Sequence, residues 1–353
     1  MDAFSEFRES RWWVLLVRPL IALVLSRLVA RLLISLVGSV DWQQVATALG
    51  QLGWAQAPLL LALLLTRQAF NSVPLAVFVP GLGFMKGFQN DLSANLVGTV
   101  APPPGDVYVR IAMFRSWGIS PVDGMPGVTL NSLAFYVIRF SIPVLGVLML
   151  IGEDLSSTQI WLAVLSLVVA AVIVGTLLLV SRGERFARLI GRRAALIAAH
   201  FREGVDAESW AEAVTGFRER MSTRLIRGLP PALAALAAMV VTDGVIVLVS
   251  LRFVGVGASS LPMVIVLGGF FVAYPLTVLP LAGLGVLDAA LVVAYTETAG
   301  AAAEPEIVAA LVVWRVLTLI GTLCLGALTF GRWHWLTRTG RLSSSDVGSQ
   351  GIA

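Results

Sequence analysis

Residues 229–251 read LPPALAALAAMVVTDGVIVLVSL, and Asp243 is the only charged side chain among them. A helix needs about 20 apolar residues to cross the hydrocarbon core of a bilayer, so this stretch predicts a membrane-spanning helix. The rest of the chain has the same character, because 58% of its 353 residues are hydrophobic and only 13% are charged. A soluble domain of this length could not bury that much apolar surface. The sequence therefore predicts an all-α bundle of membrane helices.

Further apolar stretches lie on both sides of this helix. They cover residues 14–37, 54–80, 124–151, 159–180, 261–279, 284–299 and 307–330. The stretch 284–299 is the shortest, and the others are long enough to span the bilayer as helices. We therefore expect about eight membrane segments in a single integral-membrane domain, residues 1–341, followed by a disordered, Ser/Gly-rich tail, residues 342–353.

The distribution of arginine predicts the orientation of these segments. Basic residues gather before the first stretch, in the connection 182–228 and after the last stretch, whereas the alternate connections are uncharged or acidic. Short cytoplasmic loops carry the excess of basic residues, which places both termini and the connection 182–228 in the cytoplasm. This connection has helical apolar spacing, so we expect either amphipathic helices on the membrane surface or a plain cytoplasmic helical hairpin. The arginine-rich, alanine-rich composition indicates a bacterial inner membrane.

Two short segments share the pattern T-V-x-P-x-x-G. The first covers residues 99–105 and is followed by Asp106; the second covers residues 277–283 and is followed by Asp288. A span with one embedded arginine follows each segment, Arg139 in the first case and Arg315 in the second. In the expected topology these two spans run in opposite directions, which is typical of the inverted repeats of transporters.

Proline and glycine break a helix at both segments. Proline lacks the backbone N–H and glycine costs conformational entropy, so the polar backbone must be buried in protein or line a cavity. We therefore predict that residues 89–117 form a re-entrant segment and that a matching break follows in the second half; the alternative is a simple kink. The expected hinge residues are Pro102, Pro103, Pro104 and Gly105 in the first half and Pro280, Gly283 and Gly285 in the second.

Charged side chains inside the spans are the candidate functional residues, because a charge in the bilayer is costly. The arginines are Arg67, Arg139 and Arg315, and the acids available to them are Asp106, Asp243 and Asp288. They could pair for structural reasons, or the acids could conduct protons. Alternatively, arginines without a full partner could line a cavity and bind phosphate, because the planar guanidinium donates two parallel hydrogen bonds.

At the two broken segments the chain resembles the lysylphosphatidylglycerol synthetase transmembrane family, which is flippase-like and includes the membrane half of the multiple-peptide-resistance protein. The residues that carry the resemblance are Asn95, Pro102, Gly105, Asp106 and Arg110 in the first half, and Pro280, Gly283, Gly285, Asp288 and Arg315 in the second. Both acids are usually glutamate in this family, and the triple proline departs from its pattern. The aminoacyl-transferase domain of the longer relatives is absent from this sequence.

The resemblance implies movement of a lipid headgroup between leaflets. We therefore expect translocation of an anionic phospholipid or a polyprenyl-phosphate-linked headgroup, with Asn95, Arg110, Arg139 and Arg315 as substrate-binding residues. Asp106, Asp243 and Asp288 would pair with these charges or couple transport to protons. The partners would be the lipid, the membrane, and a second copy of the chain or an enzyme of envelope synthesis; nucleic acid is not expected.

The alternatives are a non-transporting membrane partner and an enzyme of lipid or envelope-glycan synthesis. The sequence has no Asp-x-Asp motif, and its one lysine, Lys86, is not part of a Walker A motif. Cys324 is the only cysteine, and His200 and His334 fall in expected cytoplasmic regions. We therefore expect neither a metal site nor a cofactor nor a catalytic residue, although an enzyme that uses only acids is still compatible with the sequence.

Overall fold

The computed structural model describes residues 42–50, 53–100, 104–152, 157–182 and 207–339. Within these residues the chain is helical throughout and has no β-strand. The expected span 14–37, the hinge prolines Pro102 and Pro103, residues 183–206 of the long connection and the tail 342–353 lie outside the described residues.

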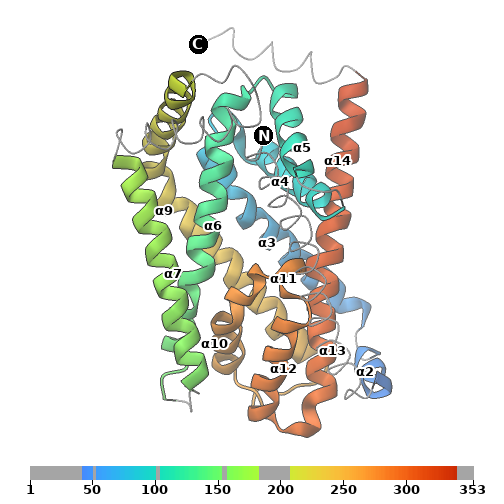
Figure 1. Ribbon diagram of the computed structural model, residues 1–353. Helices are drawn as coiled ribbons and strands as arrows, with labels where there is room; N and C mark the ends of the chain where they lie inside the picture. The colour runs from blue at the N-terminus through green and yellow to red at the C-terminus, as the bar shows by residue number, and fades with distance from the viewer. Residues whose placement is uncertain (1–41, 51–52, 101–103, 153–156, 183–206, 340–353) are drawn as a thin grey trace, which may run out of the picture.

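Long helices run the length of the molecule (Figure 1). They are α3 (Ala57–Phe78), α6 (Pro121–Met149), α7 (Ser157–Arg182), α9 (Ala207–Phe253) and the continuous unit formed by α13 (Glu304–Arg315), a π-helical turn (Val316–Gly321) and α14 (Thr322–Arg338). Shorter helices lie between them: α2 (Trp42–Leu49), α4 (Gly83–Val100), α5 (Gly105–Ser116), α10 (Met263–Ala273), α11 (Pro280–Gly283) and α12 (Val286–Ala299).

Four helices of the described chain are long and apolar enough to cross a membrane. They are Trp54–Phe78, Pro121–Met149, Arg227–Phe253 and Ala301–Arg338, and Ile160–Gly175 and Met263–Val278 are shorter apolar helices. The stretch 261–279 is thus not one full α-helix: it changes from α to 3-10 geometry at Tyr274, next to Pro275. Proline has no N–H to continue the α-helical hydrogen bonds, which accounts for the change.

Two helical hairpins fill the space between the long helices. In the first, α4 packs against α5 in the upper half of the molecule; in the second, α10 packs against α12 in the lower half (Figure 1). The chain between α10 and α12, which includes α11, lies toward the middle of the molecule. In the second hairpin the chain turns through a 3-10 helix, Tyr274–Val278, and α11, Pro280–Gly283; that either hairpin is re-entrant stays a prediction.

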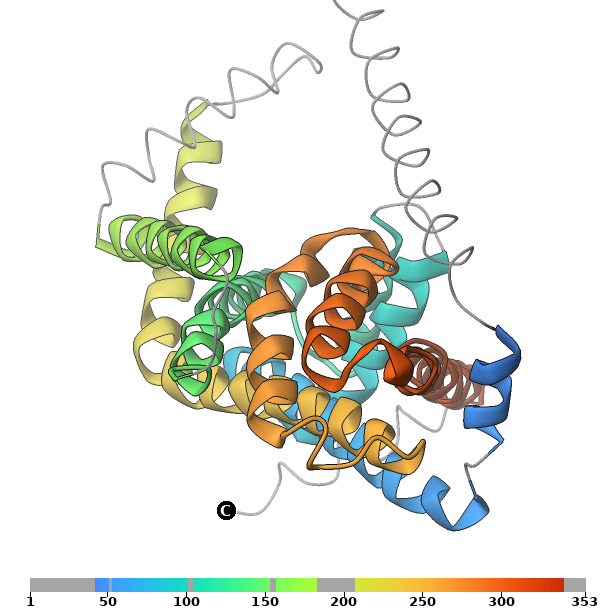
Figure 2. The same ribbon diagram turned by 90° about the horizontal axis from the view of Figure 1, so that it is seen from below.

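Helix α9 has no break where the span was expected to begin. It runs as one helix from Ala207 to Phe253, although Pro230 and Pro231 lie inside it. It packs along α3, as the view from below shows (Figure 2). Each proline removes one backbone N–H donor, so the carbonyl one turn earlier loses its helical hydrogen bond.

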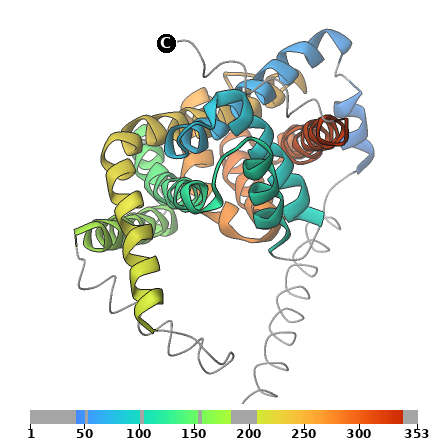
Figure 3. The same cartoon turned by 90° about the horizontal axis from the view of Figure 1, so that it is seen from above.

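Close backbone contacts position the hairpins against the long helices. A Cβ atom on Gly146 of α6 would lie 2.7 Å from the carbonyl oxygen of Gly268 in α10. Likewise, a Cβ on Gly326 of α14 would lie 2.7 Å from the Leu92 oxygen in α4, and the view from above shows α14 beside this hairpin (Figure 3). Small residues at helix crossings are the usual means of packing in membranes, where dispersion contacts replace the hydrophobic effect.

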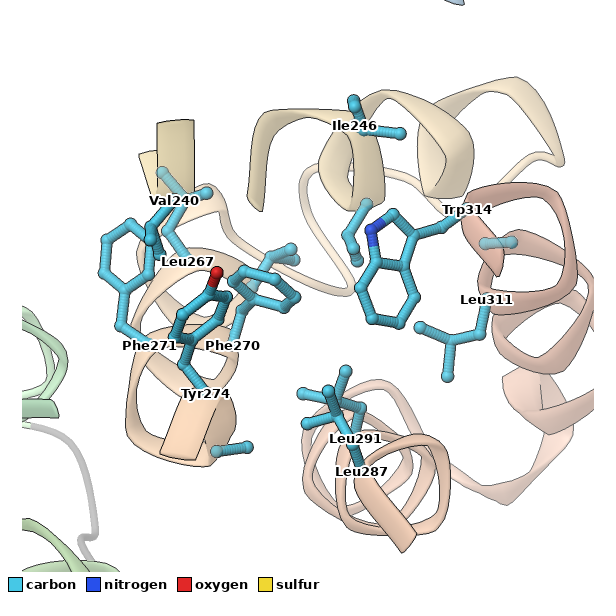
Figure 4. Packing of buried hydrophobic residues seen from close by; sticks show 14 of the residues in the cluster. Val240, Ile246, Leu267, Phe270, Phe271, Tyr274, Leu287, Leu291, Leu311 and Trp314 are labelled. Atoms are coloured by element: carbon cyan, nitrogen blue, oxygen red, sulfur yellow. The ribbon is translucent and has the colours of Figure 1, made fainter. Parts of the chain in front are cut away.

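The second hairpin is embedded in the apolar core. Phe270 of α10 lies between the Tyr274 ring and Trp314 of α13, and the rings of Phe270 and Trp314 meet edge to face with centroids 5.5 Å apart (Figure 4). Leu287 and Leu291 of α12 close the other side of this cluster. The interior next to the second hairpin is therefore filled with side chains.

Charged side chains lie at both ends of the molecule. The last turn of α5 carries Arg115 and the last turn of α14 carries Arg338, and both helices end at the top of the molecule (Figure 1). The opposite end contains the start of α13, with Glu304 and Glu306 in its first turn. The orientation in the membrane stays a prediction.

Candidate functional site: a polar cavity at the first hairpin

A cavity of about 440 Å³ opens between the first hairpin and helices α3 and α6. Its lining is largely polar or charged: Asn71 from α3; Asp91, Ala94, Asn95, Gly98 and Thr99 from α4; Asp106 and Arg110 from α5; and Asn131, Ser132, Phe135, Tyr136 and Arg139 from α6. Its volume lies within the range of small-molecule sites, and polar groups in a membrane protein normally face such cavities rather than lipid.

Arg110 joins α5 to α4. Its Nη2 lies 3.0 Å from Asp91 Oδ1, and its Nη1 donates a hydrogen bond to Asn90 Oδ1 across 2.9 Å. The second oxygen of Asp91 accepts a hydrogen bond from Asn71 of α3 at 2.5 Å. Both partners of this ion pair are largely buried. Asp91 therefore neutralises Arg110 and ties three helices together on one wall of the cavity.

Arg139 has a different environment. Its guanidinium lies 4.5 Å from the centroid of the Phe135 ring and 5.4 Å from that of Tyr136. These rings precede it by four and three residues on α6, so all three side chains share one face of the helix. No described residue forms an ion pair with Arg139, and its buried Nε has no hydrogen-bond partner there. Arg139 thus faces the cavity held by aromatic rings and without a described carboxylate partner.

Asp106 is the second charge without a described partner. It lies in the first turn of α5, where the free N–H groups and the helix dipole favour a carboxylate. Its Cβ lies close to Gly98, since a Cβ added to Gly98 would approach it to 3.2 Å. Although Asp106 and Arg110 are one helical turn apart, Arg110 pairs with Asp91 instead.

The structure brings four of the predicted site residues together and leaves three elsewhere. Asn95, Asp106, Arg110 and Arg139 line the cavity. Arg315, Asp288 and Asp243 do not line it, and each is part of a buried ion pair deeper in the bundle.

Arg315 holds the second hairpin at its break. Its Nε lies 2.7 Å from Asp288 Oδ1, and its Nη1 donates a hydrogen bond to the carbonyl of Ala282 at 3.1 Å. The other oxygen of Asp288 accepts a hydrogen bond from the Gly285 N–H at 2.7 Å. Ala282 has a positive φ of 56°, a conformation in which an L-residue is strained, and Gly283 at 71° continues it. The pair thus stabilises the irregular backbone of the break.

Asp243 links three long helices. Its Oδ2 lies 3.0 Å from Arg67 Nη2 of α3, and its Oδ1 accepts a hydrogen bond from the Trp314 indole N–H at 2.9 Å. Asp243 is almost fully buried on α9, and Trp314 belongs to α13. The charge pair predicted as one alternative for Asp243 is therefore present, with Arg67 as its partner.

Sequence reasoning missed Asp91, Asn71 and Asn131. Asp91 is the only acid in α4, whose one basic residue is Lys86, and Asn90, Ser93 and Asn95 form a polar run with it. Charge inside a membrane segment was the signal that could have identified Asp91. Asn71 and Asn131 are uncharged and give no comparable signal. They come together only in the folded protein, where α3 and α6 lie beside the first hairpin.

The comparisons with known proteins agree with the resemblance found at the two breaks. A family model described as the lysylphosphatidylglycerol synthase TM region matches residues 8–326. Neither the curated proteins nor the solved structures contain a match to this chain. Since the family model covers most of the sequence, the chain belongs to the family of lysylphosphatidylglycerol synthase transmembrane regions.

Proposed function

We propose that the protein moves a phosphate-bearing anionic lipid, either a phospholipid or a polyprenyl-phosphate-linked headgroup, between the leaflets of the membrane. The observation that carries this proposal is Arg139, which faces a polar cavity with no ion-pair partner among the described residues. A buried guanidinium stays charged and binds phosphate through parallel hydrogen bonds. The family match supports a membrane protein of lipid or envelope metabolism.

The arrangement of the hairpins supports a transport mechanism. The α4–α5 hairpin and the α10–α12 hairpin occupy opposite halves of the molecule, as two re-entrant segments of an inverted repeat would (Figure 1). Transporters of this kind bind their substrate near the middle of the bilayer, beside discontinuous helices. By the positive-inside rule, the end with Arg115 and Arg338 faces the cytoplasm, so the first hairpin enters from the cytoplasmic side.

In this mechanism Arg139 binds the headgroup phosphate. Asn95, Thr99 and Asn131 line the same cavity and offer hydrogen bonds to phosphate or hydroxyl oxygens. Arg110 holds α5 against α4 through its ion pair with Asp91 and also lines the cavity. The Pro/Gly turns beside Gly105 and Gly285 are the hinges on which the two hairpins move.

The second candidate is a membrane partner that does not transport. Three intramembrane arginines, Arg67, Arg110 and Arg315, form ion pairs with aspartates, as expected of a rigid scaffold. This candidate leaves Arg139 without a role, because a scaffold does not need a costly unpaired charge facing a cavity. Lipid translocation therefore accounts for more of the structure.

Leaflet-resolved lipid transfer in proteoliposomes tests the proposal. Vesicles with wild type, with Arg139→Ala or without protein would receive labelled phosphatidylglycerol or polyprenyl phosphate in the inner leaflet, and its appearance outside would be measured with and without a proton gradient. We expect wild type to accelerate transfer of at least one lipid and Arg139→Ala to reduce the rate on the order of 10- to 100-fold.

Arg115→Ala is the matched control, because Arg115 is an exposed arginine outside the cavity. It should transfer lipid at the wild-type rate, and all three proteins must insert and elute as folded species. Equal rates for wild-type and protein-free vesicles with both lipids, under both gradient conditions, would favour the scaffold.

A further inference from the structure

Of the four charged side chains that line the cavity, two neutralise each other and two have no described ion-pair partner. Among the described residues its ionised side chains are Asp91, Asp106, Arg110 and Arg139. Asp91 and Arg110 neutralise each other at 3.0 Å. One positive charge, on Arg139, and one negative charge, on Asp106, are left to act on a ligand.

Building on the proposed translocation, we infer that the cavity accepts a headgroup with a single negative charge, a phosphodiester, and rejects phosphate monoesters and diphosphates, with Asp106 as the residue that sets this limit. Arg139 balances the first negative charge of a headgroup. A second negative charge finds no free cation on the described walls and faces the Asp106 carboxylate.

Asp106 places its carboxylate at the N-terminus of a helix that lines the cavity. It lies in the first turn of α5, where the N-terminal N–H groups of the helix stabilise a carboxylate. No described residue forms an ion pair with it, so its charge is not cancelled locally. The same carboxylate thus lies at the helix N-terminus and lines the cavity that receives the ligand.

The size of the cavity makes this repulsion effective. A compact volume of 440 Å³ is roughly 10 Å across, which does not exceed the Debye length at ordinary salt. A ligand charge anywhere in the cavity therefore interacts with both Arg139 and Asp106. At the effective dielectric constant of such sites, one additional like-charge contact lowers affinity on the order of tenfold or more.

In this scheme the cavity selects its ligand because Asp106 repels a second negative charge, not because a further residue attracts the preferred headgroup. A second free arginine would bind diphosphates tightly, but Asp91 already occupies Arg110. An acid opposite a single arginine discriminates by charge while leaving the rest of the headgroup free to vary. The inference thus narrows the proposed substrates to lipids whose phosphate is a diester, either a phospholipid or a polyprenyl phosphate esterified to a headgroup, and excludes phosphatidic acid, free polyprenyl phosphate and diphosphates.

Phosphatidylglycerol and phosphatidic acid with identical acyl chains test the inference, because they differ in the charge of the phosphate. A phosphate monoester has its second pKa at about 6, so at pH 8.5 phosphatidic acid carries the second charge. Equilibrium binding of both lipids would be measured in detergent micelles for wild type, Asp106→Asn and Asp106→Glu, together with the transfer rates in proteoliposomes.

We expect wild type to favour phosphatidylglycerol by about tenfold or more, Asp106→Glu to keep this preference and Asp106→Asn to lose it through tighter binding of phosphatidic acid. Equal affinities in wild type, or an unchanged preference in Asp106→Asn, would overturn the inference. If Asp106→Asn does not fold, the wild-type preference is compared at pH 8.5 and at pH 5. Phosphatidic acid loses its second charge at pH 5, so the preference for phosphatidylglycerol must shrink there; an unchanged preference would overturn the inference. Binding selectivity without any transfer would reject translocation and keep the charge limit.

Discussion

Asp91 Oδ1 lies 3.0 Å from Arg110 Nη2, across the turn of the first hairpin. The ion pair holds the two arms of the hairpin together on the side that faces the cavity. Both side chains are largely buried, so each charge loses its main stabilising partner if the other is removed. This relationship makes the first hairpin a rigid wall of the site.

Removing one member of this pair should destabilise the protein more than removing both. We expect Arg110→Met and Asp91→Leu each to lower the free energy of unfolding by about 3–5 kcal/mol, because each leaves an uncompensated buried charge. The double variant should be more stable than either single variant. Unfolding by denaturing detergent, followed by circular dichroism, measures these differences. Arg115→Met, at an exposed position, serves as the control, and strictly additive losses would contradict the pairing.

Asp243 should be more sensitive to substitution than its hydrogen-bond donor Trp314. Asp243→Ala leaves Arg67 unpaired in the interior and Trp314 without its acceptor, so we expect a loss of about 3–5 kcal/mol. Trp314→Phe removes only the hydrogen bond and part of the ring contact, and should cost about 1–3 kcal/mol. Trp161→Phe is the matched control, since Trp161 is 72% exposed on the outer face. A larger loss for Trp314→Phe than for Asp243→Ala would show that the ion pair is not the main contribution.

Gly146 of α6 lies close against the backbone of α10. Valine there would bring a Cβ to 2.7 Å from the Gly268 oxygen and 2.8 Å from the Val272 nitrogen, both backbone atoms that cannot move aside. We therefore expect Gly146→Val to separate the helices and lower the thermal midpoint in detergent strongly. The same substitution at Gly175 of α7, where nothing lies within 4 Å, should leave the midpoint nearly unchanged. Similar midpoints for the two variants would contradict the packing of the second hairpin.

Substitution of Arg315 by lysine should lower the stability of the protein, because Arg315 has a structural role. Its guanidinium contacts Asp288 through Nε and Ala282 through Nη1, and a lysine ammonium cannot occupy both positions. Arg315→Lys should lower the free energy of unfolding by about 1–3 kcal/mol, whereas Arg139→Lys should change it little. Detergent unfolding of the two variants side by side tests this contrast. If Arg139→Lys destabilised the protein more than Arg315→Lys, the structural role would belong to Arg139 and the assignment would be wrong.

The sequence predicts the class of the protein better than it predicts which residues contact one another in the fold. Long apolar stretches correctly identified the spans at 54–80, 124–151 and 307–330, because helices in lipid must satisfy their own backbone groups. The stretch 261–279 was read as a full span, since hydropathy does not register the change to 3-10 geometry at Tyr274. The count of about eight segments and the inverted repeat stay predictions.

The candidate site was predicted only in part. Asn95, Arg110, Arg139 and Arg315 were expected to act with Asp106, Asp243 and Asp288. Of these, only Asn95, Asp106, Arg110 and Arg139 line the cavity. Their pairing could not be read from the sequence, because helical spacing favours Asp106 for Arg110, whereas the folded hairpin brings Asp91 to it. Contacts across a break have no periodicity, so only the tertiary structure distinguishes the paired arginines from Arg139.

Direct binding of a lipid headgroup at Arg139 tests the central claim. Affinities of short-chain phosphatidylglycerol and of the matching diacylglycerol would be measured in micelles for wild type, Arg139→Lys and Arg139→Ala. We predict that Arg139→Ala weakens phosphatidylglycerol on the order of 10- to 100-fold, that Arg139→Lys is intermediate and that diacylglycerol affinity is the same in all three. Equal phosphatidylglycerol affinities in wild type and a folded Arg139→Ala variant would contradict the claim that Arg139 binds the phosphate.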